Sequence, residues 1–476
     1  MSAWKWMARI CSKTPWMKTW SLRVYYWWKK LQYQKGYVEK EEINPKKVIF
    51  EAYMGKKYAC SPKALYQAMC RDPQYQDWEL IWAFREPEKY REMEQEPHTK
   101  VVRYRSGEYY RAYASAKFWV TNSRLPRELQ PKEGQEYIQC WHGTPLKRLG
   151  YDLDHYAEKN GSLLEVQENY LEETKRVTHM PSPSEFYSEK IASAFHLKEE
   201  GKEQVLLEMG YPRNDDLVKF SNMDCEKARQ ELRIPKGKKV ILYAPTWREN
   251  QHLPGEGYQF QLPVDFKRWR EVLGEEYVVL FRAHYFISNS FDFEAFQGFV
   301  YDVSQMDDIN PLYLAADVLI TDYSSVFFDY ANLRRPILFF MYDYEQYKHE
   351  MRDFYFDIHM LPGPVLMNQE EVLKTLKNLP DMVDKYEKKY AENSTWLLHE
   401  AFCLDGQADI FHPYEKHHST VKDACQLAEE LKVENLLLYH TEDRNLSHRK
   451  ELYYEEGRKY FSGNLLIPDD LETFII

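Results

Sequence analysis

The chain has 476 residues and a formal net charge of −11, with 44% hydrophobic and 29% charged residues. This composition supports a sizeable core and excludes a disordered chain, and the negative charge argues against a nucleic-acid binder. The length allows roughly two to four domains. No apolar run approaches the roughly 18 residues of a membrane span. No short apolar h-region with a small-residue cleavage site opens the chain, so we do not expect secretion. Seven widely spaced cysteines indicate reduced thiols in the cytosol.

Residues 1–35 differ from the rest, with eight Lys or Arg, six Trp and no acidic residue. Thr14 and Pro15 predict a helix start, as N-cap and first helical residue. On a helical wheel, one sector of roughly 120° holds Trp16, Met17, Trp20, Val24, Trp27, Trp28 and Leu31, and the basic residues Lys18, Arg23, Lys29 and Lys30 fall outside it. This pattern is typical of a helix that lies in a membrane interface on anionic lipid. The alternative is a helix packed on the protein's own core.

From residue 46 onward, short apolar strands alternate with helical stretches, which predicts parallel sheets covered on both faces. Two series of about six strands indicate two Rossmann-like domains that face a cleft. The expected strands are Val48–Ala52, Glu79–Phe84, Val101–Tyr104, Phe118–Thr121, Tyr137–Trp141, Val177–Met180, Val205–Glu208, Lys239–Ala244, Tyr277–Arg282, Phe299–Val303, Val318–Thr321 and Ile337–Phe340.

The common nucleotide and metal fingerprints are absent from the sequence. It lacks G-x-G-x-x-G and G-x-x-x-x-G-K-[ST], which disfavours an NAD enzyme and a P-loop NTPase, and it lacks H-E-x-x-H and H-x-H-x-D-H. The D-x-D of Asp152–Asp154 is interpreted as a solvated loop.

The first polar junction follows the strand Tyr137–Trp141. His142 stands at the carboxyl end of that strand, where a histidine is suited to be a general base. Gly143 allows a tight turn, and Thr144 with Pro145 predicts a helix start whose free N–H groups would favour an anion. A histidine hydrogen-bonded to a turn is the alternative.

Three further junctions repeat this arrangement. Arg282 and His284 end one strand and share a face, which suits a phosphate oxygen, although plain surface basic residues would give the same pattern. Asp322, Ser324 and Ser325 end another strand and enter a helix, where hydroxyls and N–H groups form a phosphate cradle or a plain N-cap. The fourth junction runs from Val240–Ala244 into Pro245–Arg248. Four such junctions in two sheets indicate phosphate chemistry.

Six ordered motifs resemble the CDP-glycerol glycerophosphotransferase family, the teichoic-acid primases and polymerases. They are CWHGTPLKRLGY (Cys140–Tyr151), MGYPRND (Met209–Asp215), LYAPTWR (Leu242–Arg248), FRAH (Phe281–His284), DVLITDYSSVFFDY (Asp317–Tyr330), and Arg352–Asp357 with LPGP (Leu361–Pro364). The motifs span roughly residues 46–395.

The resemblance implies a GT-B-like α/β fold without a metal or other cofactor, and transfer of glycerol phosphate from CDP-glycerol to a hydroxyl of a lipid-linked glycan or growing chain, with release of CMP. It implies that His142 is the base and that His284 stabilises charge on the pyrophosphate. It further implies donor-side roles for Arg282, Ser324, Ser325, Thr246, Arg248, Asp322 and Asp329, and acceptor-side roles for Gly143, Thr144 and Lys147. Because the family has an amphipathic membrane-docking element, the protein is expected at the cytoplasmic face of the membrane, with a homo-oligomer left open.

The tail departs from this family. His412–Ile476 resembles the C-terminal piece of a metallo-β-lactamase-fold hydrolase, in which histidines matching His417 or His418 and His440 lie around the metal. Because H-x-H-x-D-H is absent and the segment is short, we expect a fusion remnant or appended cap without a functional metal centre.

The expected parts are therefore a membrane-interface helix (1–40), an acceptor domain (45–204), a donor domain (205–400) and an extension (401–476). Three alternatives to the glycerol-phosphate transferase remain: a ribitol-phosphate or nucleotide-sugar transferase, a membrane-bound binding protein without activity, and a metal-dependent hydrolase suggested only by the tail.

Overall fold

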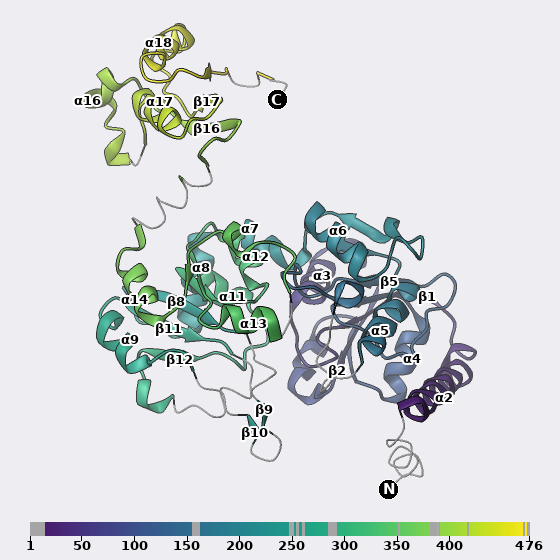
Figure 1. Ribbon diagram of the computed structural model, residues 1–476. Coiled ribbons are helices and arrows are strands. Elements are labelled where there is room, and N and C mark those ends of the chain that lie inside the picture. The colour runs from purple at the N-terminus through teal and green to yellow at the C-terminus, as the bar shows by residue number, and fades with distance from the viewer. Residues whose placement is uncertain are drawn as a thin grey trace. The chain divides into compact units, whose positions relative to one another are not determined.

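The computed structural model describes residues 15–154, 162–246, 252–253, 257–258, 262–283, 293–350, 353–380, 388, 391–416, 418–469 and 472–473. The chain divides into two compact units, Met1–Leu373 and Lys374–Ile476. The larger unit carries two parallel sheets (Figure 1).

The first sheet has the strand order β3-β2-β1-β4-β5, with every neighbouring pair parallel. Successive residues of its strands pack on opposite faces. Ile49 and Ile81 lie in one hydrophobic cluster, whereas Val48, Phe50 and Trp82 lie in the other. Both faces are therefore covered, which explains the continuous apolar runs Val48–Phe50 and Leu80–Phe84 in these strands. The elements are β1 (Asn44–Glu51), α3 (Cys60–Arg71), β2 (Glu79–Phe84), β3 (Thr99–Arg103), α4 (Gly107–Ser115), β4 (Ala116–Thr121) and β5 (Glu136–Gln139).

A small two-stranded sheet extends this half past residue 205, where the sequence places the start of the donor domain. Strand β7 (Leu206–Glu208) pairs in parallel with β6 (Met180–Ser182). Val205 and Tyr211 are buried in the same cluster as Ile49, so the segment that was assigned to the donor domain packs with the first half. The helices α5 (Leu163–Arg176) and α6 (Glu185–Ala194) complete this half.

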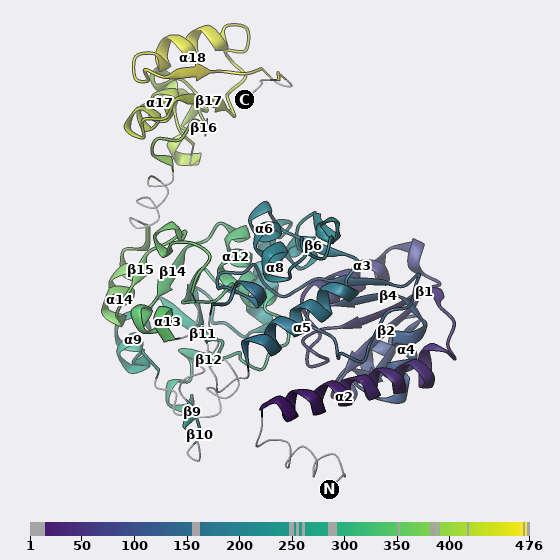
Figure 2. The ribbon, with the colours of Figure 1, turned by 45° about the vertical axis from the view of Figure 1, so that its right-hand side comes forward.

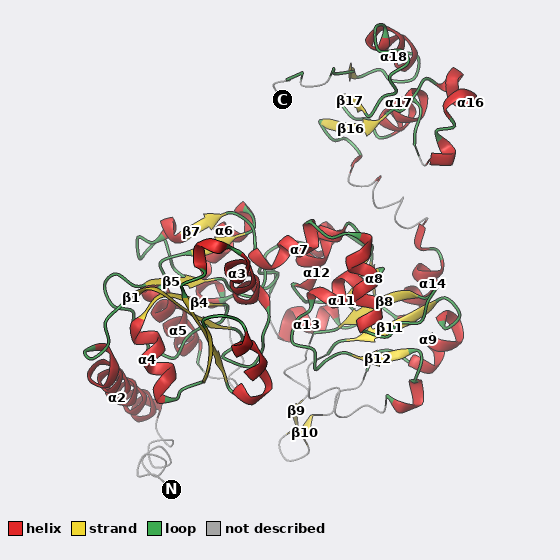
Figure 3. Cartoon of the chain, turned by 180° about the vertical axis from the view of Figure 1, so that it is seen from behind, coloured by secondary structure: helices red, strands yellow, loops and turns green. Residues whose placement is uncertain are grey.

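The second sheet has the order β12-β11-β8-β13-β14-β15, again all parallel. Figure 3 shows the helices of this half in red around the strands β8, β11 and β12 in yellow. Its strands are β8 (Lys239–Ala244), β11 (Tyr277–Phe281), β12 (Val300–Asp302), β13 (Val318–Thr321), β14 (Ile337–Phe340) and β15 (Val365–Leu366), with a separate hairpin of β9 (His252–Leu253) and β10 (Gly257–Tyr258). Its helices are α7 (Asp215–Val218), α8 (Asn222–Glu231), α9 (Phe266–Leu273), α11 (Asn310–Ala315), α12 (Val326–Tyr330), α13 (Tyr344–Glu350) and α14 (Gln369–Lys377).

The helix predicted to begin at Thr144 and Pro145 is absent, and the chain from residue 140 to 149 is irregular. The backbone there is used for pairing with another segment. Lys147 forms a β-bridge with Phe354, and the N–H of Arg148 donates to the carbonyl of Asp353 at 3.0 Å. The sequence signal for a helix start was therefore overridden by a tertiary contact, and His142 does not precede a helix.

The predicted N-terminal helix is present as α2 (Pro15–Tyr33), followed by a π-helical turn at Gln34–Val38. Thr14, its expected N-cap, lies outside the described residues. The helix lies against α5 (Figure 2), where Arg23 pairs with Glu168 at 3.0 Å and Lys30 with Glu172 at 2.8 Å. No helix in the described part of the chain is long and apolar enough to cross a bilayer.

The C-terminal unit contains a three-stranded parallel sheet of order β16-β17-β18 with its own hydrophobic cluster. The sheet begins at Trp396, before the predicted boundary at residue 401, because β16 pairs along its whole length with β17. The elements are β16 (Trp396–Glu400), α16 (Ala408–Phe411), α17 (Val421–Glu430), β17 (Asn435–Tyr439), α18 (Arg449–Gly457) and β18 (Asn464–Leu466).

Candidate active site

Each large sheet has a point at which the strand order reverses, and ligands of such sheets bind at the carboxyl ends of the strands there. In the first sheet this point lies between β1 and β4. The loops that follow these strands are held together. The backbone N–H of Tyr53 donates to Asn122 Oδ1 at 2.8 Å, and that of Met54 donates to Ser123 Oγ at 2.9 Å. Tyr53, Met54 and Gly55 all have positive φ (49°, 57° and 72°), so the chain turns sharply at this edge.

His142 joins this edge from the loop after β5. Its Nδ1 lies 2.9 Å from the carbonyl oxygen of Asn122. A carbonyl only accepts hydrogen bonds, so Nδ1 carries the proton and Nε2 keeps a lone pair. The ring lies beside Trp141, with centroids 4.5 Å apart. This tautomer is the one that a general base requires.

The surroundings of His142 also favour its neutral form. Burial lowers the pKa of His142 below its ordinary value of 6.5, and the positive charges of Arg213 and Arg124 act in the same direction. The contact with Asn122 partly opposes this shift. The histidine is thus unprotonated at neutral pH, ready to accept a proton.

A cavity of about 430 Å³ opens beside His142. Its walls come from the loops after β1, β4 and β5 and from helix α5. They include Met54, Ser123, Arg124, Trp141, Asn169 and Tyr170. His142 therefore lines a space large enough for a small polar ligand.

The second sheet reverses between β8 and β13. The loops after these strands are likewise joined, because Asp322 Oδ1 accepts hydrogen bonds from the backbone N–H of Thr246 at 2.8 Å and of Tyr323 at 2.6 Å. Ser324 and Ser325 follow and lead into α12. The predicted strand–hydroxyl–helix order is present, with Ser324 Oγ 3.4 Å from the N–H of Val326.

The carboxyl edges of the two sheets meet at Gly143. A Cβ on Gly143 would lie 2.4 Å from Ser325 Oγ, so only a residue without a side chain allows this approach. The residue after the candidate base therefore contacts the serine pair of the other sheet. The structure brings together His142, Gly143 and Ser325, which are far apart in the sequence.

The other predicted donor residues are placed only in part. Arg282 follows β11, and its Nη1 donates to the carbonyl of Val303 at 3.1 Å. Burial lowers the pKa of Arg282 from its usual range. His284 and Arg248 lie outside the described residues.

Asp329 is engaged by a neighbouring arginine. Arg213 Nε and Nη2 donate to its two carboxylate oxygens at 3.1 and 3.0 Å, and Asn214 Nδ2 donates at 3.0 Å. Asp329 raises the pKa of Arg213 against the effect of burial, and the Arg213 guanidinium also lies 3.7 Å from Cys60 Sγ of the first half. This buried ion pair connects the motif MGYPRND with the motif DVLITDYSSVFFDY and fixes their relative position at the candidate site.

Two residues predicted on the acceptor side, Thr144 and Lys147, follow Gly143 in the same irregular segment. Thr144 is buried. Lys147 Nζ donates to Tyr347 Oη at 3.0 Å and lies 5.5 Å from the centre of that ring. Neither residue lines the cavity beside His142. Asp152, interpreted from the sequence as solvated, accepts hydrogen bonds from the hydroxyls of Ser193 and Tyr355, each at 2.5 Å.

Of the predicted membrane residues, Trp27 and Trp28 are 64% and 47% exposed on α2. Lys30 pairs with Glu172, and Lys29 lies 5.8 Å from the ring of Trp28. Trp16, Lys18 and Trp20 belong to α2, but their side chains are outside the described part of the structure.

Sequence reasoning missed Arg124, Asn122 and Arg213. The first two follow β4 directly, so the rule that selected His142 at the end of β5 could have found them. Arg213 lies within a quoted motif, yet only the fold shows its contact with Asp329. Among the described residues one group could hold a metal ion, and it lies in the C-terminal unit: Glu400, His418 and His440.

Residues 33–398 match the family of CDP-glycerol:poly(glycerophosphate) glycerophosphotransferases. Over 368 residues, 77% of this chain, the sequence is 40% identical to a teichoic acid poly(glycerol phosphate) polymerase of Staphylococcus epidermidis, of which it covers 49%. A polymerase of the same name from Bacillus spizizenii is 38% identical over 77% of this chain and 90% of its own length. The chain thus spans about half of some curated relatives and most of others.

The solved structure of the wall teichoic acid polymerase TagF superposes with a TM-score of 0.68 and 38% identity, over 78% of this chain and 86% of the solved chain. TagF has also been solved after soaking with CDPG. The body of this protein has the same GT-B-like architecture of two parallel-sheet halves. The chain therefore belongs to the CDP-glycerol:poly(glycerophosphate) glycerophosphotransferase family.

Proposed function

We propose that this protein transfers glycerol phosphate from CDP-glycerol to a hydroxyl of a growing polyol-phosphate chain or lipid-linked glycan and releases CMP. The observation that carries this proposal is the contact at Gly143. It sets a neutral histidine with a free Nε2 lone pair beside the serine pair of the second sheet. An acceptor hydroxyl and a donor phosphate can then meet at one point.

In the proposed reaction, His142 Nε2 takes the proton of the acceptor hydroxyl as its oxygen attacks the phosphorus that bears glycerol. A new P–O bond forms to the acceptor, and the P–O bond to CMP breaks with its electron pair on CMP. Because in-line phosphoryl transfer needs positioning and charge stabilisation more than covalent chemistry, a fixed base and fixed phosphate ligands suffice for much of the rate.

On the donor side, Ser324, Ser325 and Arg282 are proposed to bind the phosphates. Asp322 holds the Thr246 loop against β13, which fixes the serines relative to β8. Asp329 is proposed to act through Arg213, since both of its carboxylate oxygens are already engaged. His284 and Arg248 remain sequence-based candidates for the pyrophosphate.

We also propose that α2 docks on an anionic membrane at its cytoplasmic face. Its basic residues Arg23 and Lys30 pair with α5, whereas Trp27 and Trp28 stay exposed. The aromatic surface is therefore free to enter a lipid interface. Trp27→Ala/Trp28→Ala should reduce co-sedimentation with vesicles containing anionic lipid. Unchanged sedimentation would count against this role.

The C-terminal unit is proposed to be an appended module rather than part of the transferase. Its three-stranded sheet has a cluster of its own, and the family match ends at residue 398. The resemblance of His412–Ile476 to a metallo-β-lactamase-fold piece remains a sequence-based proposal. A homo-oligomer stays open.

Release of CMP from CDP-glycerol, with and without a lipid-linked acceptor, tests the proposed function. Acceptor-dependent release that is lost in His142→Ala is the expected result. Equal release without acceptor would indicate hydrolysis. Release of CMP only from CDP-ribitol, or of a nucleoside diphosphate from a nucleotide-sugar, would replace the proposal with that alternative. The mass of the product counts the units added and separates a primase from a polymerase.

A further inference from the structure

The cavity beside His142 contains one cation whose purpose the proposed reaction does not explain. Arg124 lies on the loop after β4, is exposed, and its guanidinium sits 5.1 Å from the centre of the Tyr170 ring. Among the described residues Arg124 forms no ion pair with a carboxylate. Three residues further, Arg127 stacks on Tyr26 in a similar way but pairs with Glu168 and donates to Asn169 Oδ1 at 2.9 Å. The charge of Arg127 is therefore paired within the fold, whereas Arg124 has no carboxylate partner among the described residues.

The backbone beside Arg124 is held firmly. Asn122 and Ser123 accept hydrogen bonds from the loop after β1. On the other side, the buried guanidinium of Arg176 donates to the carbonyls of Pro126 at 2.8 Å and Leu129 at 3.0 Å. When a ligand binds, a cation on a fixed loop loses less conformational entropy than a cation on a mobile loop. Arg124 therefore belongs to a built binding surface.

The rest of the cavity suits the remainder of a polyol phosphate. Glu165 and Asn169 on α5 lie on its wall and can bind hydroxyl groups. His142 is neutral, the guanidinium of Arg213 is paired with Asp329, and Arg124 is the one Lys or Arg among the described residues that line the cavity. Guanidinium groups bind phosphate oxygens in bidentate fashion, which fixes orientation as well as position.

We propose that Arg124 binds the last phosphodiester of the acceptor chain, so that the terminal glycerol hydroxyl reaches His142 Nε2. This inference rests on the proposed function and names the acceptor that the site selects. An acceptor that already ends in glycerol phosphate is then preferred to one that lacks it.

The test compares Arg124→Gln with wild type on two lipid-linked acceptors, one ending in a single glycerol phosphate and one without it. We expect KM for the phosphate-bearing acceptor to rise about tenfold or more, because a charge-assisted contact is lost. KM for the phosphate-free acceptor and for CDP-glycerol should stay within about twofold. The matched control is Arg105→Gln, which removes an exposed arginine stacked on Tyr104 at 5.4 Å outside the cavity and should change neither KM.

A calorimetric titration with sn-glycerol 3-phosphate decides the site without turnover. Binding weakened about tenfold in Arg124→Gln supports the proposal. Equal binding in the two proteins, or equal changes in KM for both acceptors, overturns it. If wild type releases no CMP, the proposed function is wrong, but the titration still shows whether Arg124 binds a glycerol phosphate.

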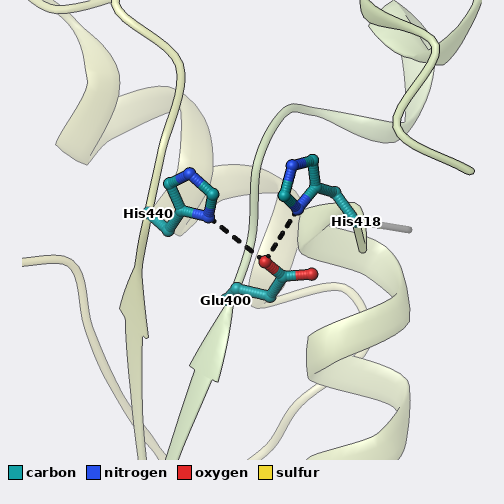
Figure 4. A group of neighbouring side chains, drawn as sticks. All are labelled: Glu400, His418 and His440. Atoms are coloured by element: carbon teal, nitrogen blue, oxygen red, sulfur yellow. Dashed lines mark hydrogen bonds and ion pairs between the residues drawn. The ribbon is translucent and has the colours of Figure 1, made fainter. Parts of the chain in front are cut away.

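A second, independent observation concerns the C-terminal unit. Glu400 ends β16, His440 follows β17, and His418 precedes α17, so the three side chains converge at the carboxyl edge of that sheet (Figure 4). The Nδ1 atoms of His418 and His440 lie 3.0 and 3.2 Å from Glu400 Oε2. The other oxygen, Oε1, is fixed by the N–H of Ser419 at 3.1 Å.

The spacing of these atoms fits a small divalent cation. A tetrahedral zinc ion with ligands at about 2.0–2.1 Å has ligand–ligand edges of roughly 3.3 Å, close to the two nitrogen–oxygen separations, and the three ligand atoms all lie within 4.8 Å of one another. Two imidazoles and a carboxylate are a donor set that zinc prefers. The ring of Phe402 stacks on His418 with centroids 4.9 Å apart and holds it in place.

We infer that Glu400, His418 and His440 bind one Zn²⁺-class ion, contrary to the sequence-based expectation of no functional metal centre. The full chain is titrated with Zn²⁺ in competition with a chromophoric chelator. One ion per chain is expected, with affinity about tenfold or more weaker in Glu400→Gln and in His418→Ala. The control is His448→Ala, because His448 forms an exposed pair with Glu451 at 3.6 Å and should not matter.

Zinc should also raise the melting temperature of wild type and not that of Glu400→Gln. Equal affinity in wild type and all three variants, or no binding by wild type, overturns the inference. Circular dichroism of each variant shows whether a loss of binding reflects loss of fold.

Discussion

At the carboxyl end of the first sheet, the loops after β4 and β5 present an arginine and a neutral histidine. At the same place in the second sheet, the loops after β8 and β13 present an aspartate and two serines. The two sheets have the same architecture at this edge, but they present different functional groups there. We propose that one edge supplies the base beside a cavity and that the other supplies phosphate ligands. The contact of Gly143 with Ser325 makes them one site.

The largest effect should follow from removing the base. His142→Ala should lower the rate of CMP release about 10²–10⁴-fold, the usual contribution of general acid–base catalysis. Ser325→Ala should cost less, because neighbouring groups still hold the donor. Single-turnover CMP release measures both. His179→Ala, a half-exposed histidine of the same half, is the control. Equal losses in His142→Ala and Ser325→Ala would contradict the division of roles.

Removing the ion pair that supports the loop after β4 should lower the stability of the protein strongly. Arg176 and Glu173 form a fully buried ion pair, and Arg176 also binds the carbonyls of Pro126 and Leu129. Breaking such a pair costs about 3–5 kcal/mol because a charge stays buried without its partner. Arg176→Met should therefore shift the urea midpoint strongly.

On the second edge, Asp322→Ala removes the hydrogen bonds to Thr246 and Tyr323, so it should cost about 1–3 kcal/mol. Urea unfolding of both variants makes the comparison. A larger loss in Asp322→Ala would reverse the order of the two edges.

The pH dependence of stability should also separate the two halves. Burial raises the pKa of Glu51 from 4.5 to about 7, although the hydroxyls of Tyr109 and Tyr113 donate to it. The stabilisation from the protonated carboxyl is complete below pH 4.5 and is lost as pH rises through 7, a change of about 3 kcal/mol. Glu51→Gln should flatten this dependence in thermal melts at pH 5 and 8. The exposed Glu86→Gln is the control, and an unchanged slope in Glu51→Gln would refute the shift.

The pH dependence of activity should reflect the protonation of His142 at the carboxyl edge of the first sheet. Because burial lowers the pKa of His142 below 6.5, transfer should stay constant down to that pH and fall only as the histidine protonates below it. A profile of kcat/KM against pH measures this. An acidic limb centred above 6.5 would mean that another group is the base.

The smallest effect is expected at Lys147. Its bond to Tyr347 Oη is a half-buried polar contact, so Lys147→Met should cost about 1 kcal/mol of stability and little activity. A large rise in KM for the acceptor would restore the acceptor-side role that the sequence predicted.

Much of the fold could be predicted from apolar runs alone. Glu79–Phe84, Lys239–Ala244, Val318–Thr321 and Ile337–Phe340 are strands with the predicted bounds. Such strands can be recognised in a sequence because burial on both faces leaves few polar positions in them. The helix at Thr144 was wrong, since N-cap and proline signals are local and the pairing with Asp353 and Phe354 is not.

The sequence by itself determined the strand–helix alternation and the residues at the strand ends, because periodicity and turn chemistry are local. Only the tertiary structure decided what those residues meet: that His142 bonds Asn122, that Gly143 lies against Ser325, and that Asp329 is held by Arg213. The physical reason is that parallel strands order themselves across the sheet independently of their order in the chain. Contacts at a sheet edge, and the tautomer and pKa shift that follow from them, depend on packing between distant segments.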